Sequence, residues 1–451
     1  MAECISVVGL GRLGLCLAAC LAEKGFAALG VDVDENVVAA VNRGMSPVVE
    51  PGLDALIARH GGANLRATLR HRDAIEETGV TFVLVATPSN GDGSFSNRHV
   101  EPALRALGGA LRASSKESHL FVISSTVMPG ACESSFIPLL QESSGRRLNQ
   151  GFAVCYDPEF VALGNVINGF LQPDLVVIGE SNAQAGASVE AMHRQMCENN
   201  PAISHMSIVS AEIAKVCLNA YITLKISFAN SVANLCERIP GSDVDAITGA
   251  IGADRRISPY YLRGGPSFGG LCFPRDVQAY MALAGKYGVQ ADLMRAVEQV
   301  NQAQDRHLLE LVLREMAHTE KKTVGVLGLA FTANTPVVTE SSAVKLIAEL
   351  LQEDVHVVAY DPLAIENTRA LFGNKVDYAD SAASCLAQAG VCVITLRSPE
   401  LKQAVETFVP AHTLTVVDCW RIINVARLDR SVSYIALGRA QDYYHTPGRR
   451  R

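Results

Sequence analysis

Long apolar runs, paired cysteines and a surplus of basic residues are all missing from this 451-residue chain. No stretch reaches the roughly 18 uninterrupted apolar residues that mark a transmembrane helix, so we expect no membrane span. The 12 cysteines include no CxxC pair and no zinc-ligand spacing, which predicts no metal site and a reduced, cytoplasmic setting. The formal net charge of -7 argues against a nucleic-acid partner, because such proteins usually present a basic face.

A large apolar fraction is present instead. Hydrophobic residues make up 49% of the chain and charged residues 19%, enough to bury a sizeable core, and the length suggests about two to four domains. An apolar stretch at residues 5–21 resembles a secretory signal in composition. However, Glu3 precedes it and three glycines interrupt it, which argues against a signal peptide.

Short apolar runs alternate with amphipathic stretches up to about Glu180. Because these runs are apolar on both faces, they predict parallel strands covered by helices on both sides, as in a doubly wound α/β domain. The predicted strands are Cys4–Val8, Ala27–Val31, Val80–Ala86, Leu120–Ser124, Phe152–Tyr156 and Leu175–Ile178.

The middle of the chain changes character. Ala211–Arg238 holds no proline or glycine and predicts one long helix that ends before Pro240-Gly241. More helices are predicted at Asp243–Ile251, Arg275–Tyr287 and Leu293–Ala317. The strand-helix rhythm then resumes, with predicted strands at Thr323–Leu327, Val355–Tyr360, Val391–Thr395 and Leu414–Asp418.

This layout predicts an α/β protein with two Rossmann-like, doubly wound parallel-sheet domains joined by an all-helical region. The predicted parts are residues 1–206, 207–317 and 318–444, followed by a loose tail at 445–451. Both α/β parts open with a strand that runs into a glycine-rich turn. This resembles a duplication of a whole domain architecture and not a short-period sequence repeat.

The first of these turns is Gly9-Leu10-Gly11-Arg12-Leu13-Gly14. Between a strand and a helix, the first glycine permits the turn, the second lets the backbone approach a pyrophosphate, and the third allows close packing. Asp32 ends the next strand, where its carboxylate would accept from ribose hydroxyls and repel a 2′-phosphate, so the predicted cofactor is NAD. Asp34 is a second candidate for the ribose contact. The alternative is a glycine turn and a capping aspartate that bind nothing.

Hydroxyl and acidic residues follow three further predicted strands. Thr87-Pro88-Ser89 and Ser124-Ser125-Thr126 come at the carboxyl ends of parallel strands, where open α/β sheets bind ligands. Glu159, in Asp157-Pro158-Glu159-Phe160, would point into the same crevice. Each segment is also compatible with a turn, a helix cap or a surface loop.

Two more patterns lie in the helical region. Glu212, Lys215 and Asn219 recur at i, i+3 and i+7 of the long helix, so they share one face, which lies either along a cavity or in solvent. The glycine-rich segment 264–270 runs into Cys272 at a predicted helix start, where the helix dipole and nearby cations favour a thiolate. Asp276 follows one turn later as a base near the thiol. A small buried cysteine is the commoner alternative.

In this order the motifs resemble the UDP-glucose/GDP-mannose dehydrogenase family over nearly the whole chain. The resemblance implies an NAD-dependent enzyme that oxidises the C6 alcohol of a nucleotide sugar, such as a UDP-sugar, to a uronic acid. Four electrons are removed, through a cysteine thiohemiacetal and thioester. It also implies a homodimer formed by the central helices, in which Arg256 reaches the neighbouring subunit's substrate. The matching pieces are SSTVMPG, YDPEF, EIAKVCLNAYITLKISFANSVANLCERI, GADRRI, SFGGLCFPRD and GLAF…ES.

The resemblance assigns roles to individual residues. Lys215 and Asn219 would stabilise a developing alkoxide, and segment 264–270 would wrap the sugar diphosphate. The implied catalytic residues are Thr126, Glu159, Lys215, Asn219, Cys272 and Asp276. The implied substrate contacts are Glu159, Phe160, Lys215, Asn219, Arg256, Tyr261, Arg263, Gly269, Phe331 and Arg421. The predicted cofactor contacts are Gly9, Gly11, Arg12, Leu13, Gly14, Asp32, Thr87, Pro88 and Thr126.

Four positions depart from the family pattern, and one of them is Leu163, which stands near the place of a second acidic residue beyond Phe160. Where the family has cations after Phe331, this chain has Thr332 and Thr339, and each missing contact would remove a charge-assisted hydrogen bond of about 1.5–3 kcal/mol. Asp157 stands where the family usually has asparagine, and Arg421 would restore one cation. The alternatives are therefore a two-electron or unusual-substrate nucleotide-sugar dehydrogenase, and a non-catalytic paralogue that binds NAD or a nucleotide sugar.

Overall fold

The computed structural model describes residues 4–440 and divides into two compact units. The first unit comprises Met1–Leu218 and Ala282–Gly288, and the second comprises Asn219–Met281 and Val289–Arg451. The predicted tail at 445–451 lies outside the described residues. No helix in the described part of the chain combines the length and apolar character needed to cross a membrane.

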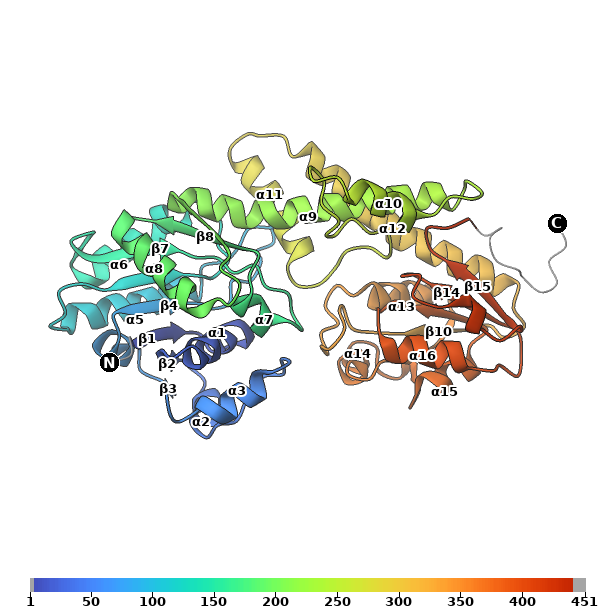
Figure 1. Cartoon of the computed structure of the whole chain (residues 1–451), viewed down its shortest axis with the longest axis horizontal. Helices are drawn as coiled ribbons and strands as arrows, with labels where there is room; N and C mark the ends of the chain where they lie inside the picture. The colour runs from blue at the N-terminus through green and yellow to red at the C-terminus, as the bar shows by residue number, and fades with distance from the viewer. Residues whose placement is uncertain (1–3, 441–451) are drawn as a thin grey trace. The chain divides into compact units, whose positions relative to one another are not determined.

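The first unit contains a sheet with helices on both faces (Figure 1). Its strands are β1 (Cys4–Val8), β2 (Ala27–Val31), β3 (Leu65–Thr68), β4 (Val80–Val83), β5 (Leu120–Ile123), β6 (Arg147–Leu148), β7 (Gly151–Tyr156), β8 (Leu175–Glu180) and β9 (Ala202–Met206). Its helices are α1 (Arg12–Glu23), α2 (Glu35–Asn42), α3 (Leu53–His60), α4 (His71–Glu77), α5 (Val100–Ala113), the π-helix η1 (Cys132–Phe136), α6 (Ile137–Ser144), α7 (Val166–Leu171) and α8 (Ala183–Met196).

The strand order of this nine-stranded sheet is β3-β2-β1-β4-β5-β7-β8-β9, with β6 paired to β7. Neighbouring strands are parallel except for β7 and β8, which run antiparallel. Alternate residues of β1 enter two separate cores. Ile5 and Val7 pack in one core with Leu15 of α1, whereas Val8 packs in the other with Phe121 of β5. Burial on both faces explains why these strands read as unbroken apolar runs.

The second unit contains a six-stranded parallel sheet of order β12-β11-β10-β13-β14-β15. Its strands are β10 (Thr323–Leu327), β11 (His356–Tyr360), β12 (Asp377–Tyr378), β13 (Val391–Ile394), β14 (Leu414–Asp418) and β15 (Val432–Ala436). Its helices are α10 (Val244–Gly252), α12 (Asp292–Ala317), α13 (Ser342–Gln352), α14 (Ile365–Phe372), the 3-10 helix η2 (Gly373–Lys375), α15 (Ala382–Gln388), α16 (Pro399–Thr407) and the 3-10 helix η3 (Val425–Arg427). Helices α9 (Ile208–Cys236) and α11 (Phe273–Lys286) contribute residues to both units.

The two sheets share one local device. In the first sheet, Gly9 after β1 has φ +93° and Asp32 after β2 accepts from the backbone of the same turn. In the second, Gly328 after β10 has φ +94°. Asp361 after β11 accepts from the backbone N–H groups of the two residues that follow Gly328. The predicted fold class, two Rossmann-like parallel-sheet domains with a helical region between them in the sequence, is confirmed. The antiparallel strand β8 is the exception to the predicted parallel arrangement.

Candidate functional site

The three glycines of the first turn have three different surroundings. Gly9 is left-handed, and a Cβ there would meet Leu84 O at 2.6 Å. A Cβ on Gly14 would clash with Gly9 O, whereas a Cβ on Gly11 would meet nothing within 4 Å. The tight turn, the close packing and the open backbone of a dinucleotide fingerprint are therefore all present. No side chain caps α1, so its N-terminal N–H groups face the space beside Gly11 and suit a phosphate.

Asp32 holds this turn from the end of β2. Its Oδ2 accepts from Leu10 N at 2.6 Å, and its Oδ1 accepts from Asp34 N at 3.0 Å. Each carboxylate oxygen has a further lone pair that suits a ribose hydroxyl. Asp34 is the N-cap of α2, and its side chain accepts from Asn36 N at 2.8 Å. The residues present therefore fit NAD, with Asp32 as the ribose acceptor and Asp34 as a helix cap.

The residues after β4 and β5 are buried at the ends of those strands. Thr87 and Thr126 are both buried. Ser125 ties the two segments together, because its Oγ donates to Val85 O at 2.8 Å and accepts from Val85 N at 2.9 Å. Ser124 Oγ is also buried and has no hydrogen-bond partner among the described residues. Ser125 is thus a structural tie, and Ser124 and Thr126 leave polar groups at the strand ends.

Glu159, Phe160 and Lys215 come together in the first unit. Lys215 Nζ donates to the backbone oxygen of Glu159 and lies 3.4 Å from its Oε1. The ammonium group also lies 5.0 Å from the centroid of the Phe160 ring. Lys215 is only 4% exposed, so its charge depends on these partners rather than on water. The ordered segment after β7 therefore fixes a buried cation on α9.

A small cavity of about 30 Å³ lies beside this group, with Ser124, Asp157, Glu159 and His193 in its lining. His193 Nε2 is 2.8 Å from Asp157 Oδ2. Burial opposes the imidazolium, but the charge and hydrogen bond of Asp157 outweigh it and raise the pKa of His193 to about 10. At neutral pH the two residues form a buried ion pair next to the loop that carries Glu159. The sequence analysis did not identify His193, and no spacing signal links it to Asp157.

Glu212 shows that the polar stripe of α9 is buried. Its carboxylate accepts from Gly130 N at 2.5 Å and from Cys132 N at 2.9 Å. Burial raises the pKa of Glu212, although these hydrogen bonds act in the opposite direction. Lys215 and Asn219 on the same helix are buried as well. The alternative of a solvated stripe is therefore wrong, and Glu212 anchors the turn that leads into η1.

Asn219 and Asp276 meet in the second unit. Asn219 Nδ2 donates to Asp276 Oδ2 at 2.5 Å, and Arg275 Nε lies 3.5 Å from Asp276 Oδ1. Asp276 N donates to Cys272 O at 2.8 Å, which places Cys272 at the start of α11. Within the described chain, Cys272 alone among the cysteines is exposed. The alternative of a buried cysteine is therefore wrong, and the thiol lies next to the N-terminus of α11.

The glycine-rich segment 264–270 packs closely against protein atoms. Gly270 has φ +79°, and a Cβ there would meet the Phe331 ring at 2.5 Å. A Cβ on Gly269 would clash with Glu340 O. The segment is also held by buried amide side chains that the sequence analysis missed, those of Asn230, Asn301 and Gln304. Its glycines are thus needed for packing, and its backbone is rigidly placed.

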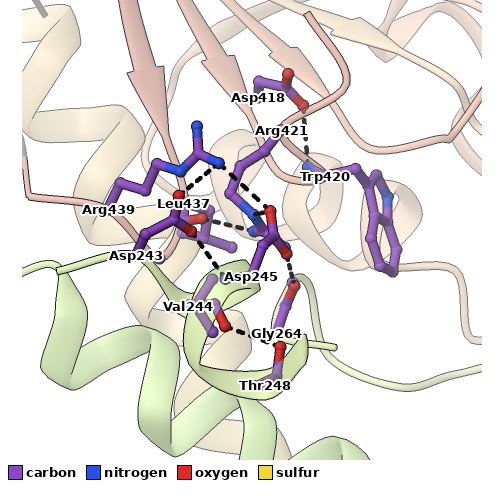
Figure 2. A network of polar contacts seen from close by, with 12 residues as sticks. Asp243, Val244, Asp245, Thr248, Gly264, Asp418, Trp420, Arg421, Leu437 and Arg439 are labelled. Carbon is purple, nitrogen blue, oxygen red and sulfur yellow. Dashed lines mark hydrogen bonds and ion pairs between the residues drawn. The ribbon is translucent and has the colours of Figure 1, made fainter. Parts of the chain in front are cut away.

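The Arg421 side chain is buried within a network of polar contacts whose other charged members, Asp243, Asp245 and Arg439, are partly exposed (Figure 2). Its Nε and Nη2 donate to the two oxygens of Asp245 at 2.8 and 3.0 Å. Its remaining donors reach the backbone oxygens of Cys419, Leu437 and Gly264. All five N–H donors of the guanidinium are then in use. In this structure Arg421 fastens the start of segment 264–270, and its contact with substrate stays a prediction.

Three other predicted substrate residues precede this segment. Arg256 is exposed and bound to its neighbour Asp254, with Nη2 and Oδ2 2.6 Å apart. Tyr261 has φ +60° and packs edge-on against Phe273, with ring centroids 5.9 Å apart. Arg263 is exposed. Their roles toward a substrate, including the reach of Arg256 across a dimer, stay predictions.

Comparisons with known proteins agree with this geometry. Sequence profiles of the UDP-glucose/GDP-mannose dehydrogenase family match its NAD binding domain at residues 3–197, its central domain at 209–303 and its UDP binding domain at 325–425. A UDP-glucose 6-dehydrogenase of Haloferax volcanii is 38% identical over 93% of this chain and 97% of its own length. A GDP-mannose 6-dehydrogenase of Pseudomonas putida is 34% identical over 84% of each chain.

Solved structures give the same result. A UDP-glucose dehydrogenase from the hyperthermophilic archaeon Pyrobaculum islandicum is 32% identical, covers 98% of both chains and superposes with a TM-score of 0.87. The profiles cover most of the sequence, and the first of them is an NAD binding domain that contains the glycine turn and Asp32. The chain therefore belongs to the UDP-glucose/GDP-mannose dehydrogenase family and is an NAD-dependent dehydrogenase.

Proposed function

We propose that this chain oxidises the C6 alcohol of a nucleotide sugar to a carboxylate by removing four electrons, with a UDP-sugar as the preferred substrate. The relatives named UDP-glucose and GDP-mannose 6-dehydrogenases and the match to a UDP binding domain support this substrate class. The observation that carries the proposal is on α9. There a buried lysine is held by Glu159, and one turn later Asn219 is held by Asp276.

NAD supplies the hydride acceptor for both oxidations. Gly9, Gly11 and Gly14 shape the turn for its pyrophosphate, and the N–H groups of Arg12 and Leu13 at the start of α1 donate to it. Asp32 accepts from the ribose. Thr87, Pro88 and Thr126, at the carboxyl ends of the neighbouring strands, line the rest of the cofactor site.

Cys272 carries the covalent step. After C6 loses its first hydride and its hydroxyl proton, Sγ adds to the aldehyde carbon, which keeps the carbonyl from escaping as a hydrate. Loss of a second hydride from C6 and of the hydroxyl proton of the thiohemiacetal gives a thioester. Water then attacks the acyl carbon, the C–S bond breaks, and the carboxylate leaves while the thiol is regenerated.

The surrounding groups stabilise charge and move protons. Lys215 and Asn219 donate toward the oxygen on C6, where negative charge develops in both oxidations. Asp276 with Lys215 orients the hydrolytic water, and Thr126 and Glu159 assist proton transfer. Phe160, Tyr261, Arg263, Gly269, Phe331 and Arg421 complete the proposed substrate site.

A homodimer and a three-part chain belong to the same proposal. Tyr221, Phe228 and Leu235 recur every seven residues on α9, and each is at least half exposed. Such an apolar stripe on a helix suits a second copy of the chain, from which Arg256 would reach the partner's substrate. Phe228→Asp should shift the mass measured by sedimentation to that of a monomer. In this proposal residues 1–206 bind NAD, 207–317 carry the cysteine and the dimer contacts, and 318–444 bind the nucleotide.

NADH formation with a panel of UDP-, GDP- and dTDP-hexoses tests the function. Two NADH per sugar and a carboxylate product, identified by mass, support it, and no turnover with any member refutes it. Cys272→Ser should stop the reaction before the carboxylate forms. The control is Cys4→Ser, a change to a half-buried cysteine far from Cys272 in the sequence, which should leave the number of NADH formed per sugar unchanged. Full carboxylate formation by the Cys272→Ser variant would refute the thioester route.

The threonines at positions 332 and 339 favour one alternative, a two-electron or unusual-substrate dehydrogenase. One NADH per sugar with an aldehyde or ketone product would select it. Saturable NAD binding without turnover for any sugar would select the non-catalytic paralogue.

A further inference from the structure

Arg397 lies at the point of the second sheet where ligands of such folds bind. The strand order runs from β10 outward through β11 in one direction and from β13 outward through β14 in the other. The carboxyl ends of β10 and β13 therefore form the topological switch point of this sheet, where ligands of open α/β sheets bind. Thr332 belongs to the segment after β10, and Arg397 lies three residues after β13. Thr395 joins the two strand ends by donating to Leu327 O at 3.2 Å.

Trp420 fixes the surroundings of Arg397. Its indole Nε1 donates to Thr395 O at 2.8 Å, so the segments after β13 and β14 are tied together. The guanidinium carbon of Arg397 lies 5.9 Å from the indole ring centroid. A Cβ on Gly265 would meet the same ring at 2.9 Å. Arg397 and the segment that begins with Arg263 thus share one aromatic neighbour, and both arginines are exposed.

Of four arginines around Trp420, Arg421 and Arg439 form ion pairs with carboxylates among the described residues, and Arg263 and Arg397 do not. Asp245 binds Arg421 and lies 3.6 Å from Arg439, and Arg439 also pairs with Asp243 at 2.8 Å (Figure 2). Two carboxylates are therefore engaged by two arginines. Within residues 4–440, neither Arg263 nor Arg397 forms an ion pair or hydrogen bond with a carboxylate. Partial desolvation, followed by the positive charges of Arg263 and Arg421, lowers the pKa of Arg397, although the charge of Asp245 acts in the opposite direction.

We propose that Arg397 binds the diphosphate of the nucleotide sugar, together with Arg263, and supplies the positive charge that Thr332 and Thr339 do not. This inference rests on the proposed function. A diphosphate is the occupant that fits, because a planar guanidinium makes paired hydrogen bonds to phosphate oxygens. The start of α16 adds partial positive charge two residues further on, where Ser398 is the N-cap.

Binding of UDP, measured by calorimetry on the full chain without NAD, tests the proposal directly. Arg397→Gln should weaken UDP binding roughly 10- to 100-fold, and Arg397→Lys should recover part of the loss. Arg430→Gln, which changes an exposed arginine of the same unit, should leave the affinity unchanged. Binding of uridine, which has no phosphate, should be equal in all variants. In turnover, Arg397→Gln should raise KM for the nucleotide sugar far more than it lowers kcat.

The outcomes separate this inference from the proposed function. Equal UDP affinity in the Arg397→Gln and wild-type proteins overturns the role of Arg397, whatever the turnover assay shows. An equal loss for uridine and UDP also overturns it, because the contact would then be to the nucleoside. Failure of the wild-type protein to bind UDP or GDP overturns it as well. Unchanged unfolding temperature of the ligand-free variants shows that a loss of affinity does not come from misfolding. Absence of turnover together with a phosphate-dependent loss refutes the proposed function alone.

Discussion

The buried pair of Asp157 and His193 makes stability depend on pH in a way that a single substitution should remove. Asp157→Asn keeps the size of the side chain and an oxygen that can accept from the imidazole, but it removes the negative charge. Without that charge, burial favours the neutral imidazole, so His193 should no longer hold its extra proton at neutral pH.

The magnitude follows from the shift in pKa. A histidine with a pKa of about 6.5 when unfolded and about 10 when folded contributes up to about 4 kcal/mol at pH 7. Because the folded pKa is raised, the contribution is complete below pH 6.5 and is lost as the pH rises through 10. Removing one partner of a buried ion pair costs a similar amount, about 3–5 kcal/mol. For a unit of this size, the loss at pH 7 corresponds to roughly 8–15 °C in Tm.

Thermal unfolding of wild type and Asp157→Asn between pH 6 and 10.5 provides the assay. The gap in Tm should be widest near pH 6.5 and should close by pH 10.5. Asp377→Asn is a matched control, because Asp377 and His356 form a pair of the same length, 2.8 Å, that is more than half exposed. An exposed pair should contribute less than about 1 kcal/mol. His193→Gln should match Asp157→Asn at pH 7, and the double variant should add little to either.

The reasoning would be refuted if wild type and Asp157→Asn differed in Tm by the same amount at pH 7 and at pH 10.5. The destabilisation would then come from packing rather than from the protonation of His193. A loss at pH 7 no larger than that of Asp377→Asn would also refute the reasoning. Additive losses in the double variant would show that the two side chains stabilise the fold independently.

Three other predictions concern the second unit and α9. Gly270→Ala should lower the free energy of unfolding, measured in urea, by roughly 1–3 kcal/mol and should reduce kcat. The control is Gly241→Ala, where φ is +82° but no atom lies within 4 Å of the added Cβ, so only the backbone strain should destabilise the protein. Asp245→Asn should lower the free energy of unfolding by about 2–4 kcal/mol, because Arg421 is fully buried and loses its charged partner; equal urea midpoints for wild type and variant would contradict this. Asn219→Ala should lower kcat roughly 100-fold with a smaller change in KM for the sugar; the reverse pattern in steady-state kinetics would place Asn219 in substrate binding only.

Apolar runs located the strands that are buried on both faces and missed those at the edges. The bounds of β1, β2, β10 and β14 were predicted as the structure has them. The strands β3, β6, β9, β12 and β15 were missed. Strands β3 and β15 alternate buried residues with more exposed ones, β6 and β12 are two residues long, and β9, with the sequence AISHM, is largely half-exposed. An edge strand needs no unbroken apolar run, because solvent covers one of its faces. The direction of β8 was also missed, since composition does not encode strand direction.

In the candidate site, the residues that depend on local geometry were predicted and those brought together only by the tertiary fold were missed. Spacing within one helix predicted that Lys215 and Asn219 share a face, and the fingerprint predicted the turn at Gly9, because both depend on local geometry. His193 was missed because 36 residues separate it from Asp157 and only the tertiary fold brings them together. The amide side chains that hold segment 264–270 were missed for the same reason. Asparagine and glutamine on a helix carry no local sign of the distant backbone that they bind.

Arg421 and Arg397 show that the sequence alone cannot decide which of two arginines binds a phosphate. Both follow a strand of the second sheet by three residues, but the sequence analysis named only Arg421 as a candidate cation there. Arg421 uses all five donors on Asp245 and three backbone oxygens, so a phosphate must displace a protein partner before it can bind there. Arg397 makes no such bonds to the described residues, so a phosphate would relieve its charge without breaking any contact. The free energy of binding therefore favours Arg397 over Arg421 as the contact of the diphosphate.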